Sequence, residues 1–204
     1  MTTMRARELA VAGAYEFTPP SFADERGVFV SPHHHDDFVA AVGHPLFPVA
    51  QSSYSSSRRG VVRGVHFALT PPGVAKYVYC PRGQVLDMVV DTRVGSPTYG
   101  RFDAVVLDQD DRRALYFPVG VGHAFVSLED DSVVHYLLSG VYVPENELAI
   151  SALDPALDLP VPRDVTPILS ERDRVAPTLA EAAARGLLPD YAACRQIEKE
   201  LRSR

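Results

Sequence analysis

The chain has 204 residues, of which 46% are hydrophobic and 23% charged, with a formal net charge of −6 at pH 7. This size and composition predict one globular domain spanning residues 1–204, and the negative charge argues against a nucleic-acid partner. No apolar run reaches the ~20 residues of a membrane span, no signal peptide is evident and only two cysteines occur, so we expect a reduced, cytoplasmic setting without membrane contact.

The first distinctive feature along the chain is a run of three histidines, His33–His35. Adjacent residues of a strand point to opposite faces, so these three imidazoles cannot easily converge on one metal ion. We interpret the run as a surface loop and not as a metal site.

The segment from Gln51 to Cys80 combines a histidine, a lysine and several arginines with apolar, strand-like runs. His66 lies between two apolar residues, and Lys76 directly precedes the strand-like run Tyr77–Tyr79. A base beside a fixed cation suits proton abstraction next to a carbonyl, because the base takes the proton and the cation holds the enolate oxygen. The alternative is a hydrogen-bonded core histidine and a charge at a strand edge, and this segment alone supports both interpretations equally.

The middle of the chain has the pattern of short strands separated by turn residues. In the run Val85–Asp91, apolar side chains alternate with Asp87 and Asp91, which predicts a half-buried strand with both carboxylates on its polar face. Further strands are expected at Ala104–Asp108, Ala114–Phe117, Gly122–Leu128 and Ser132–Leu138. Regular short strands of this kind favour an all-β sandwich or barrel.

The C-terminal part of the chain changes to a helical pattern. Thr178–Glu181 has the sequence of a capping box that opens a short alanine-rich helix, and Gly186 is expected to close it. Asp190 can cap a second helix, whose apolar stripe would consist of Tyr191, Cys194, Ile197 and Leu201. The proline-rich segment from Pro155 to Pro167 is expected to connect the barrel to these helices.

A set of short motifs occurs in a fixed order along nearly the whole chain. They are Asp24–Phe29, Gln51–Ser55, Arg63–Phe67, Lys76, Asp87 with Asp91–Gly100, Pro118–Phe125, Tyr136 with Tyr142–Glu147, Leu153–Pro155 and Leu169–Asp173. Together they resemble the motifs of the dTDP-4-dehydrorhamnose 3,5-epimerase family. The resemblance implies a cupin-type jelly-roll barrel over about residues 15–155, followed by a connector and short C-terminal helices over about 156–204. The motifs around Pro118–Phe125 and Ser151–Pro155 look closest to epimerases of antibiotic deoxysugar pathways.

The resemblance implies a catalytic set for a dTDP-4-keto-6-deoxyhexose, whose C3 and C5 hydrogens are acidified by the 4-keto group. It implies that His66 is the base, that Asp173 orients its imidazole, and that Lys76 stabilises the enolate oxygen. Tyr136 matches the acid that returns a proton on the opposite face of the sugar. Taken alone, Tyr136 would be a satisfied buried tyrosine and Asp173 a solvated loop acid. We prefer inversion at C5, with C3 or both carbons as the alternatives.

Further residues match the family's substrate-binding positions. They are Arg26, Gln51, Ser53, Arg63, His123, Tyr142, Glu147 and Arg172. Arginine suits a diphosphate because its planar fork matches phosphate oxygens, and Tyr142 matches a residue that stacks on thymine. If the strand that carries Tyr136 continued to Tyr142, it would separate the two rings by roughly 20 Å.

Some positions depart from the family's pattern or conflict with a regular strand. Ser31 and Ser53 replace an acid and an asparagine, which puts individual nucleotide contacts in doubt, and Arg172 replaces a lysine. Strict alternation would place Arg63 and His66 on opposite faces of one strand. A bulge or bend near Gly64 would bring them to the same side, and the sequence does not show whether one is present.

The predicted site requires no cofactor. A cupin metal site usually combines two closely spaced histidines with a carboxylate, and His66 lacks that pattern, so the sequence predicts no metal. The alternatives are a metal-dependent cupin isomerase acting on a sugar and a non-catalytic sugar-nucleotide binding cupin. The resemblance also implies a homodimer paired through strands near the N-terminus, with Arg26 in a site shared at that interface.

Overall fold

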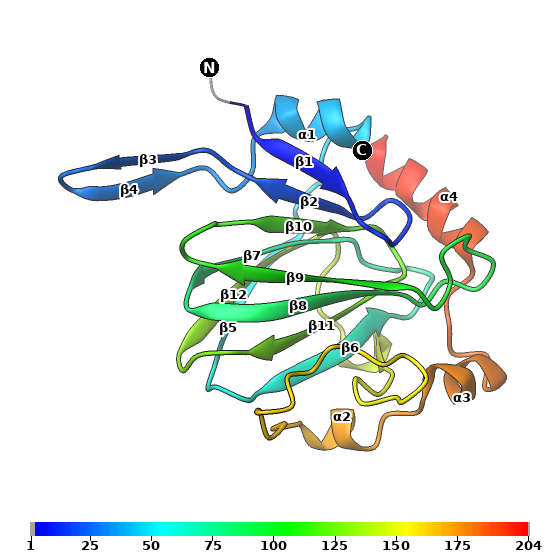
Figure 1. The fold of residues 1–204 in the computed structure, drawn as a ribbon. Coiled ribbons are helices and arrows are strands. Elements are labelled where there is room, and N and C mark those ends of the chain that lie inside the picture. The colour runs from blue at the N-terminus through cyan, green and yellow to red at the C-terminus, as the bar shows by residue number, and fades with distance from the viewer. Residues whose placement is uncertain (1–2, 204) are drawn as a thin grey trace.

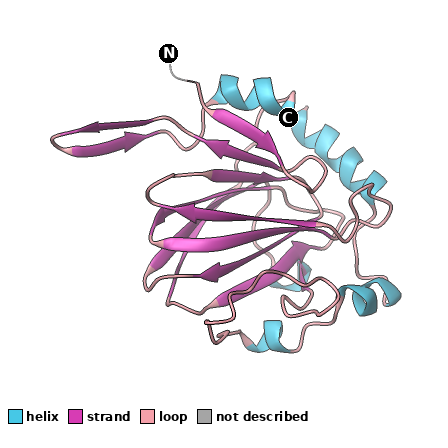
Figure 2. Ribbon diagram, in the orientation of Figure 1, coloured by secondary structure: helices cyan, strands magenta, loops and turns pink. Residues whose placement is uncertain are grey.

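The computed structural model describes residues 3–203, which form two antiparallel β-sheets packed face to face with helices on the outside (Figures 1 and 2). The first sheet contains, in spatial order, β1 (Arg5–Glu8), β2 (Tyr15–Thr18), β10 (Ala114–Phe117), β7 (Lys76–Arg82), β12 (Ser132–Leu138) and β5 (Gln51–Ser57). The second contains β13 (Glu147–Ala149), β6 (Val62–Ala68), β11 (Val121–Ser127), β8 (Gln84–Asp91) and β9 (Phe102–Asp108). This arrangement confirms the predicted all-β jelly roll.

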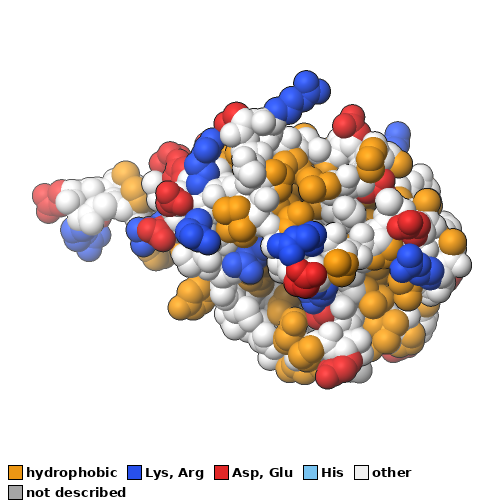
Figure 3. All heavy atoms as spheres, turned by 90° about the horizontal axis from the view of Figure 1, so that it is seen from below, with side chains coloured by type: hydrophobic (Ala, Val, Ile, Leu, Met, Phe, Trp, Pro, Cys, Tyr) orange, Lys and Arg blue, Asp and Glu red, His pale blue; other side chains and the backbone are white. Residues whose placement is uncertain are grey.

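A separate two-stranded hairpin projects from the first sheet. It consists of β3 (Ser21–Asp24) and β4 (Gly27–Val30), which pair only with each other among the strands that the structure assigns. We call this hairpin the arm, and it stands clear of the two sheets (Figures 1 and 3). The side chains of Phe22, Val28 and Phe29 on the arm are exposed.

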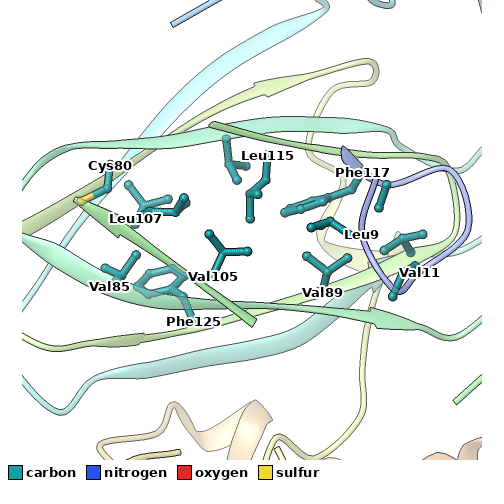
Figure 4. Packing of buried hydrophobic residues seen from close by; sticks show 14 residues of the cluster. Leu9, Val11, Cys80, Val85, Val89, Val105, Leu107, Leu115, Phe117 and Phe125 are labelled. Carbon is teal, nitrogen blue, oxygen red and sulfur yellow. The ribbon is translucent and has the colours of Figure 1, made fainter. Parts of the chain in front are cut away.

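The space between the two sheets holds the main hydrophobic core. Leu115 and Phe117 of the first sheet meet Val85, Val105 and Phe125 of the second, and each of these side chains is buried (Figure 4). Alternate residues of a strand face the same side, so each strand contributes every second side chain to this layer. Burying a side chain of this size stabilises the fold by about 1.5–3 kcal/mol.

The outer faces of both sheets are also covered. On the first sheet, Phe38 of α1 and Cys194 of α4 pack against Phe17 and Tyr116. On the second sheet, the covering side chains include Ile150, Ala152, Leu157, Leu159, Val165 and Ala182. The proline-rich segment that the sequence predicts as a connector therefore forms one wall of the molecule as well.

This two-sided burial corrects the prediction for β8. The sequence predicts a half-buried strand with Asp87 and Asp91 on its polar face, but both side chains are fully buried. Met88 and Val90 face the C-terminal covering segment, so Asp87 and Asp91 point to the opposite side, toward the other sheet. Each carboxylate has a partner there, as expected for buried charges.

The helices are α1 (His35–Val42), α2 (Glu171–Arg174), α3 (Leu179–Ala184) and α4 (Tyr191–Arg202), with a 3₁₀ turn η1 (Pro144–Asn146). Both predicted C-terminal helices are confirmed with their caps. Thr178 and Glu181 form the reciprocal capping box of α3, and the Asp190 side chain accepts a hydrogen bond from the backbone N–H of Ala193 in α4. No helix in the described part of the chain is long and apolar enough to cross a membrane.

The structure revises the interpretation of the histidine run. His35 is the first residue of α1, and the His33 ring packs edge-on against Phe38 and Tyr77, with centroids 5.5 and 5.4 Å away. The sequence missed this helix because it is only two turns long and only Phe38 within it is buried. Within residues 3–203, no group of three His, Cys, Asp or Glu side chains is arranged to hold a metal ion.

Candidate active site

A cavity of about 470 Å³ lies between the two sheets. The predicted site residues that line it are Gln51, Ser53, Arg63, His66, Lys76, His123, Tyr136, Tyr142, Glu147 and Arg172. Asp173 lies directly behind His66, whereas Arg26 is on the arm and does not line the cavity. The structure thus brings together residues that are up to 121 positions apart in the sequence, from Gln51 to Arg172.

His66 and Asp173 form a hydrogen-bonded pair at one wall of the cavity. The distance from His66 Nε2 to Asp173 Oδ1 is 2.5 Å, and the carboxylate is almost fully buried at the start of α2. Arg172 Nη2 lies 2.9 Å from the same Nε2, but the contact with Asp173 is the shorter one. Since an ionised carboxylate only accepts hydrogen bonds, we assign the proton to Nε2, which leaves Nδ1 as the basic atom. Burial lowers the pKa of His66, and the charge of Asp173 partly opposes this effect. A neutral imidazole of this kind can take up a proton.

A bulge in β6 turns Arg63 and His66 toward the same cavity. In the pairing with β11, His66 lies opposite His123, but Arg63 lies opposite Phe125, so three steps along β6 match two along β11. Gly64 occupies the irregularity with φ of +111°, and a Cβ atom there would lie 2.3 Å from the carbonyl oxygen of His123. A bulge that resolves the conflict between Arg63 and His66 is therefore present at Gly64.

Tyr136 reaches the cavity from the opposite sheet. It lies on β12, and its hydroxyl is 3.2 Å from Ser55 Oγ on the neighbouring strand β5. Burial raises the pKa of Tyr136 to about 12, so the phenol keeps its proton at neutral pH. The cavity thus has a basic imidazole on one wall and a protonated phenol on the other.

Lys76 is the first residue of β7 and its side chain is partly buried in the cavity wall. Burial lowers the pKa of Lys76, and the negative charges of Glu147 and Asp87 oppose this effect. An ammonium in such a position can stabilise negative charge that develops on a ligand oxygen.

The polar residues near the cavity mouth form a connected group. Gln51 donates a hydrogen bond from Nε2 to Ser53 Oγ (2.8 Å) and accepts one on Oε1 from the backbone N–H of Tyr142 (2.8 Å). Tyr142 is 52% exposed and lies in the loop after β12, which ends at Leu138. The strand therefore does not continue from Tyr136 to Tyr142, and the separation of roughly 20 Å that a continued strand would give does not apply.

Arg26 lies away from the cavity of its own chain, and its expected role in a site shared with a second copy stays a prediction. Arg26 is at the tip of the arm, its side chain is 85% exposed, and it forms an ion pair with Asp24 on the same hairpin. It contacts none of the cavity residues of its own chain among the interactions of the described residues.

The sequence did not point to two further residues that contact side chains of the site, Ser55 in the cavity and Asp87 behind it. Ser55 is the hydrogen-bond partner of Tyr136, and its alternation with Gln51 and Ser53 along β5 was a signal that all three face inward. Asp87 is the partner of His123, with 2.7 Å between Oδ2 and Nε2. The signal for Asp87 was an acid inside a strand whose other residues are almost all apolar.

Comparison with known proteins identifies the family. The family model described as dTDP-4-dehydrorhamnose 3,5-epimerase matches residues 8–181. The chain belongs to this epimerase family. The resemblance seen in the motifs is therefore confirmed, and the protein is a sugar-nucleotide epimerase with the cupin-type fold of that family.

Three relatives of the epimerase show how far the similarity extends. The dTDP-4-dehydrorhamnose 3,5-epimerase of Mycolicibacterium smegmatis is 49% identical over 98% of each chain. The dTDP-4-dehydrorhamnose 3-epimerase of Streptomyces niveus is 50% identical over 95% of this chain and 93% of its own. The solved structure of ChmJ, a 3′-monoepimerase from Streptomyces bikiniensis in complex with dTDP-quinovose, is similar with a TM-score of 0.91. Its sequence is 43% identical, and the match covers 97% of this chain and 100% of that one.

Proposed function

We propose that this epimerase acts on a dTDP-4-keto-6-deoxyhexose by proton transfer alone, without a cofactor. The observation that carries the proposal is the His66–Asp173 pair facing a cavity that Tyr136 enters from the opposite sheet. Inversion next to a carbonyl needs a base on one face of the sugar and an acid on the other, and simple binding needs neither.

In the proposed reaction, Nδ1 of His66 removes the proton from a carbon next to the 4-keto group. The C–H electron pair forms the enolate, and the negative charge on O4 is stabilised by Lys76. Tyr136 then donates its proton to that carbon from the opposite face, which inverts the centre. Proton return from His66 to Tyr136 through solvent resets the enzyme.

Which carbon is inverted depends on how the sugar lies between His66 and Tyr136. The sequence favours C5, and this stays a prediction. The names of the relatives from M. smegmatis, S. niveus and S. bikiniensis all include C3, which favours exchange at C3 as part of the activity. We propose that C3 is inverted, and the experiment below tests C5 in the same measurement.

We further propose that the polar mouth of the cavity binds the dTDP group. Arg63 and Arg172 are exposed enough to reach a diphosphate, and the Tyr142 ring is available for stacking on thymine. ChmJ in complex with dTDP-quinovose supports this ligand class.

The arm provides the argument for a homodimer. An isolated two-stranded hairpin is marginally stable in water, yet this one carries exposed Phe22, Val28 and Phe29. We propose that a second copy of the chain covers these side chains and receives Arg26 in its dTDP site.

Arg26→Ala should leave the dimer intact and weaken dTDP binding about tenfold or more, as for a lost charge-assisted hydrogen bond. The exposed Arg185→Ala is the matched control, and a stable, fully active monomer in sedimentation contradicts the proposal.

The decisive experiment is NMR of solvent deuterium uptake by dTDP-4-keto-6-deoxyglucose, which reports C3 and C5 separately. Wild-type enzyme should incorporate deuterium at C3 and give inverted product, with the same rate after treatment with a chelator. Loss of activity with the chelator would support the metal-dependent isomerase, and binding without exchange would support the non-catalytic module.

A further inference from the structure

Arg172 makes an unusual contact with the proposed base. Its Nη2 lies 2.9 Å from His66 Nε2, and its Nε lies 3.9 Å from Asp173 Oδ1. Arg172 and Asp173 are neighbours in α2, so one guanidinium reaches both members of the His66–Asp173 pair. The proposed proton transfer steps do not use this side chain.

The contact between the two nitrogens is electrostatically unfavourable. Each of the three nitrogens of a guanidinium carries hydrogen, and none of them accepts a hydrogen bond. Since Nε2 of His66 already donates to Asp173, no hydrogen bond can form between Nη2 of Arg172 and Nε2. The attraction that remains is the ion pair with the Asp173 carboxylate, and at 3.9 Å it is too long for a hydrogen bond.

Arg172 is the most exposed of the three side chains. It is 43% exposed, against 20% for His66 and 3% for Asp173. Its guanidinium has no other ion pair or hydrogen bond among the side chains in the described part of the chain. By contrast, Arg174 of the same helix has an ion pair with Glu171. The Arg172 guanidinium is therefore the member of this group that can change its partner.

A diphosphate offers Arg172 a better partner than the imidazole does. Hydrogen bonds from arginine to phosphate are charge-assisted, frequently bidentate and roughly twice as strong as those between neutral groups. Arg172 lines the cavity, so its guanidinium is within the space that a ligand enters. A diphosphate bound in this cavity therefore competes with the His66–Asp173 pair for the same guanidinium.

We propose that Arg172 couples binding of the nucleotide to the action of the base: its guanidinium lies against the His66–Asp173 pair and transfers to the diphosphate of the substrate. This proposal rests on the proposed function. After the transfer the imidazole is a stronger base, because a neighbouring cation no longer opposes the uptake of a proton. The base thus reaches its full strength only when a ligand with a diphosphate is bound.

The groups that face His66 determine the size of this effect. They are Asp173 and Arg172 from α2, Lys76 from β7 and His123 from β11. Burial is the largest cause that lowers the pKa of His66; Asp173 raises it, and the charges of Arg172 and Lys76 lower it. Removal of a cation in direct contact with the ring should raise this pKa by about one pH unit.

The test is the pKa of His66, measured by NMR of nitrogen-15-labelled histidine without and with saturating dTDP. The signal of His66 is identified by its absence in His66→Asn. In the wild type, dTDP should raise this pKa by about one pH unit or more. In Arg172→Gln the pKa should already be about one pH unit higher without dTDP, and its further rise on binding should be less than half that of the wild type. The charge of dTDP itself acts in both proteins, so their difference reports the arginine.

Further variants separate this coupling from a structural role. Arg172→Lys keeps the charge and should restore the low pKa of His66 without dTDP and its rise on binding. Arg172→Gln should bind dTDP about tenfold more weakly, as for a lost charge-assisted hydrogen bond. Arg174→Gln is the matched control, because Arg174 is an exposed arginine of α2 that does not line the cavity, and it should change neither property. Thermal unfolding reports whether each variant is folded, and Arg172→Met replaces the glutamine variant if that one does not fold.

Three outcomes contradict the proposal. Equal responses of the His66 pKa to dTDP in folded Arg172→Gln and in the wild type, with normal deuterium exchange by the wild type, overturn this inference alone. The same spectra show which ring nitrogen carries the proton, and a proton on Nδ1 of the neutral ring would mean that Nε2 accepts from Arg172, which also overturns it. Absence of deuterium exchange in the wild type overturns the proposed function and this inference with it.

Discussion

The two histidine–aspartate pairs of the cavity share a geometry but differ in their surroundings. The His66 side chain is 20% exposed and its carboxylate comes from α2, 107 positions along the chain. The His123–Asp87 pair joins neighbouring strands and is closed off from solvent. A group that changes charge in every turnover must exchange protons with water, whereas a group that keeps a constant charge is best enclosed. The comparison teaches that two pairs with the same hydrogen bond can differ in their access to solvent, and the His66–Asp173 pair is the more open of the two.

The largest expected effect separates the two histidines. His66→Asn should reduce both exchange and inversion by about 100- to 10,000-fold, because it removes the general base, while dTDP still binds. Deuterium uptake measures the reaction, and titration with dTDP measures binding. His34→Asn, an exposed histidine outside the cavity, serves as the control. Turnover within tenfold of wild type would remove His66 from the role of base.

A second pair of variants separates exchange from inversion. Tyr136→Phe should retain part of the exchange but block inversion, because His66 then returns the proton to the face it came from. Lys76→Ala should lower exchange and inversion together by about 100- to 1,000-fold, because the enolate itself is no longer stabilised. Product configuration is compared with deuterium content for both, with the outward-facing Tyr54→Phe as a control. Near-normal inversion by Tyr136→Phe would show that another group is the acid.

The next effect tests the His66–Asp173 pair through the pH dependence of exchange. Asp173 raises the pKa of His66 against the lowering by burial, so Asp173→Asn should lower this pKa further. The base then stays neutral to lower pH, and the acidic limb of the exchange profile should move to lower pH. The plateau should fall about 10- to 100-fold because the imidazole loses its orienting partner. Glu171→Gln, an exposed carboxylate in the same helix, should leave the profile unchanged. A shift to higher pH would contradict the assigned pairing.

The smallest effect concerns the hydrogen bond that orients the acid. Ser55→Ala removes the partner of the Tyr136 hydroxyl, and one such bond contributes about 0.5–1.5 kcal/mol. The ratio of inversion to exchange should therefore fall roughly 2- to 10-fold. The neighbouring Ser56→Ala faces away from the cavity and should have no effect. An unchanged ratio in Ser55→Ala would mean that Tyr136 is held by its packing alone.

Local patterns in the sequence predicted those parts of the fold that depend on neighbouring residues. The caps at Thr178 and Asp190 are set by side chains within three positions, and both were predicted. The conflict between Arg63 and His66 is also visible in the alternation of β6, and a bulge or bend near Gly64 was a way to resolve it. Family motifs then supplied the cavity residues, which periodicity alone could not have assembled.

Features that depend on distant segments were not predictable in the same way. Asp87 and Asp91 were assigned to a polar face because alternation along β8 cannot report that residues 150–165 cover the strand's other side. Arg26 was predicted to serve a site shared with a second copy of the chain, and its place at the tip of the arm depends on how the hairpin leaves the barrel, which the sequence did not show. In both cases the missing information is tertiary contact, which local periodicity does not contain.

The bulge at Gly64 has a consequence for the length of the ligand. Three residues of a regular strand span about 10 Å, but Arg63 and His66 lie opposite two successive inward positions of β11, Phe125 and His123, which are about 7 Å apart along that strand. The bulge thereby shortens the separation along β6 between the backbone positions of Arg63 and His66. A strand irregularity of one residue therefore sets the spacing at which this wall of the cavity presents a cation and an imidazole to a ligand.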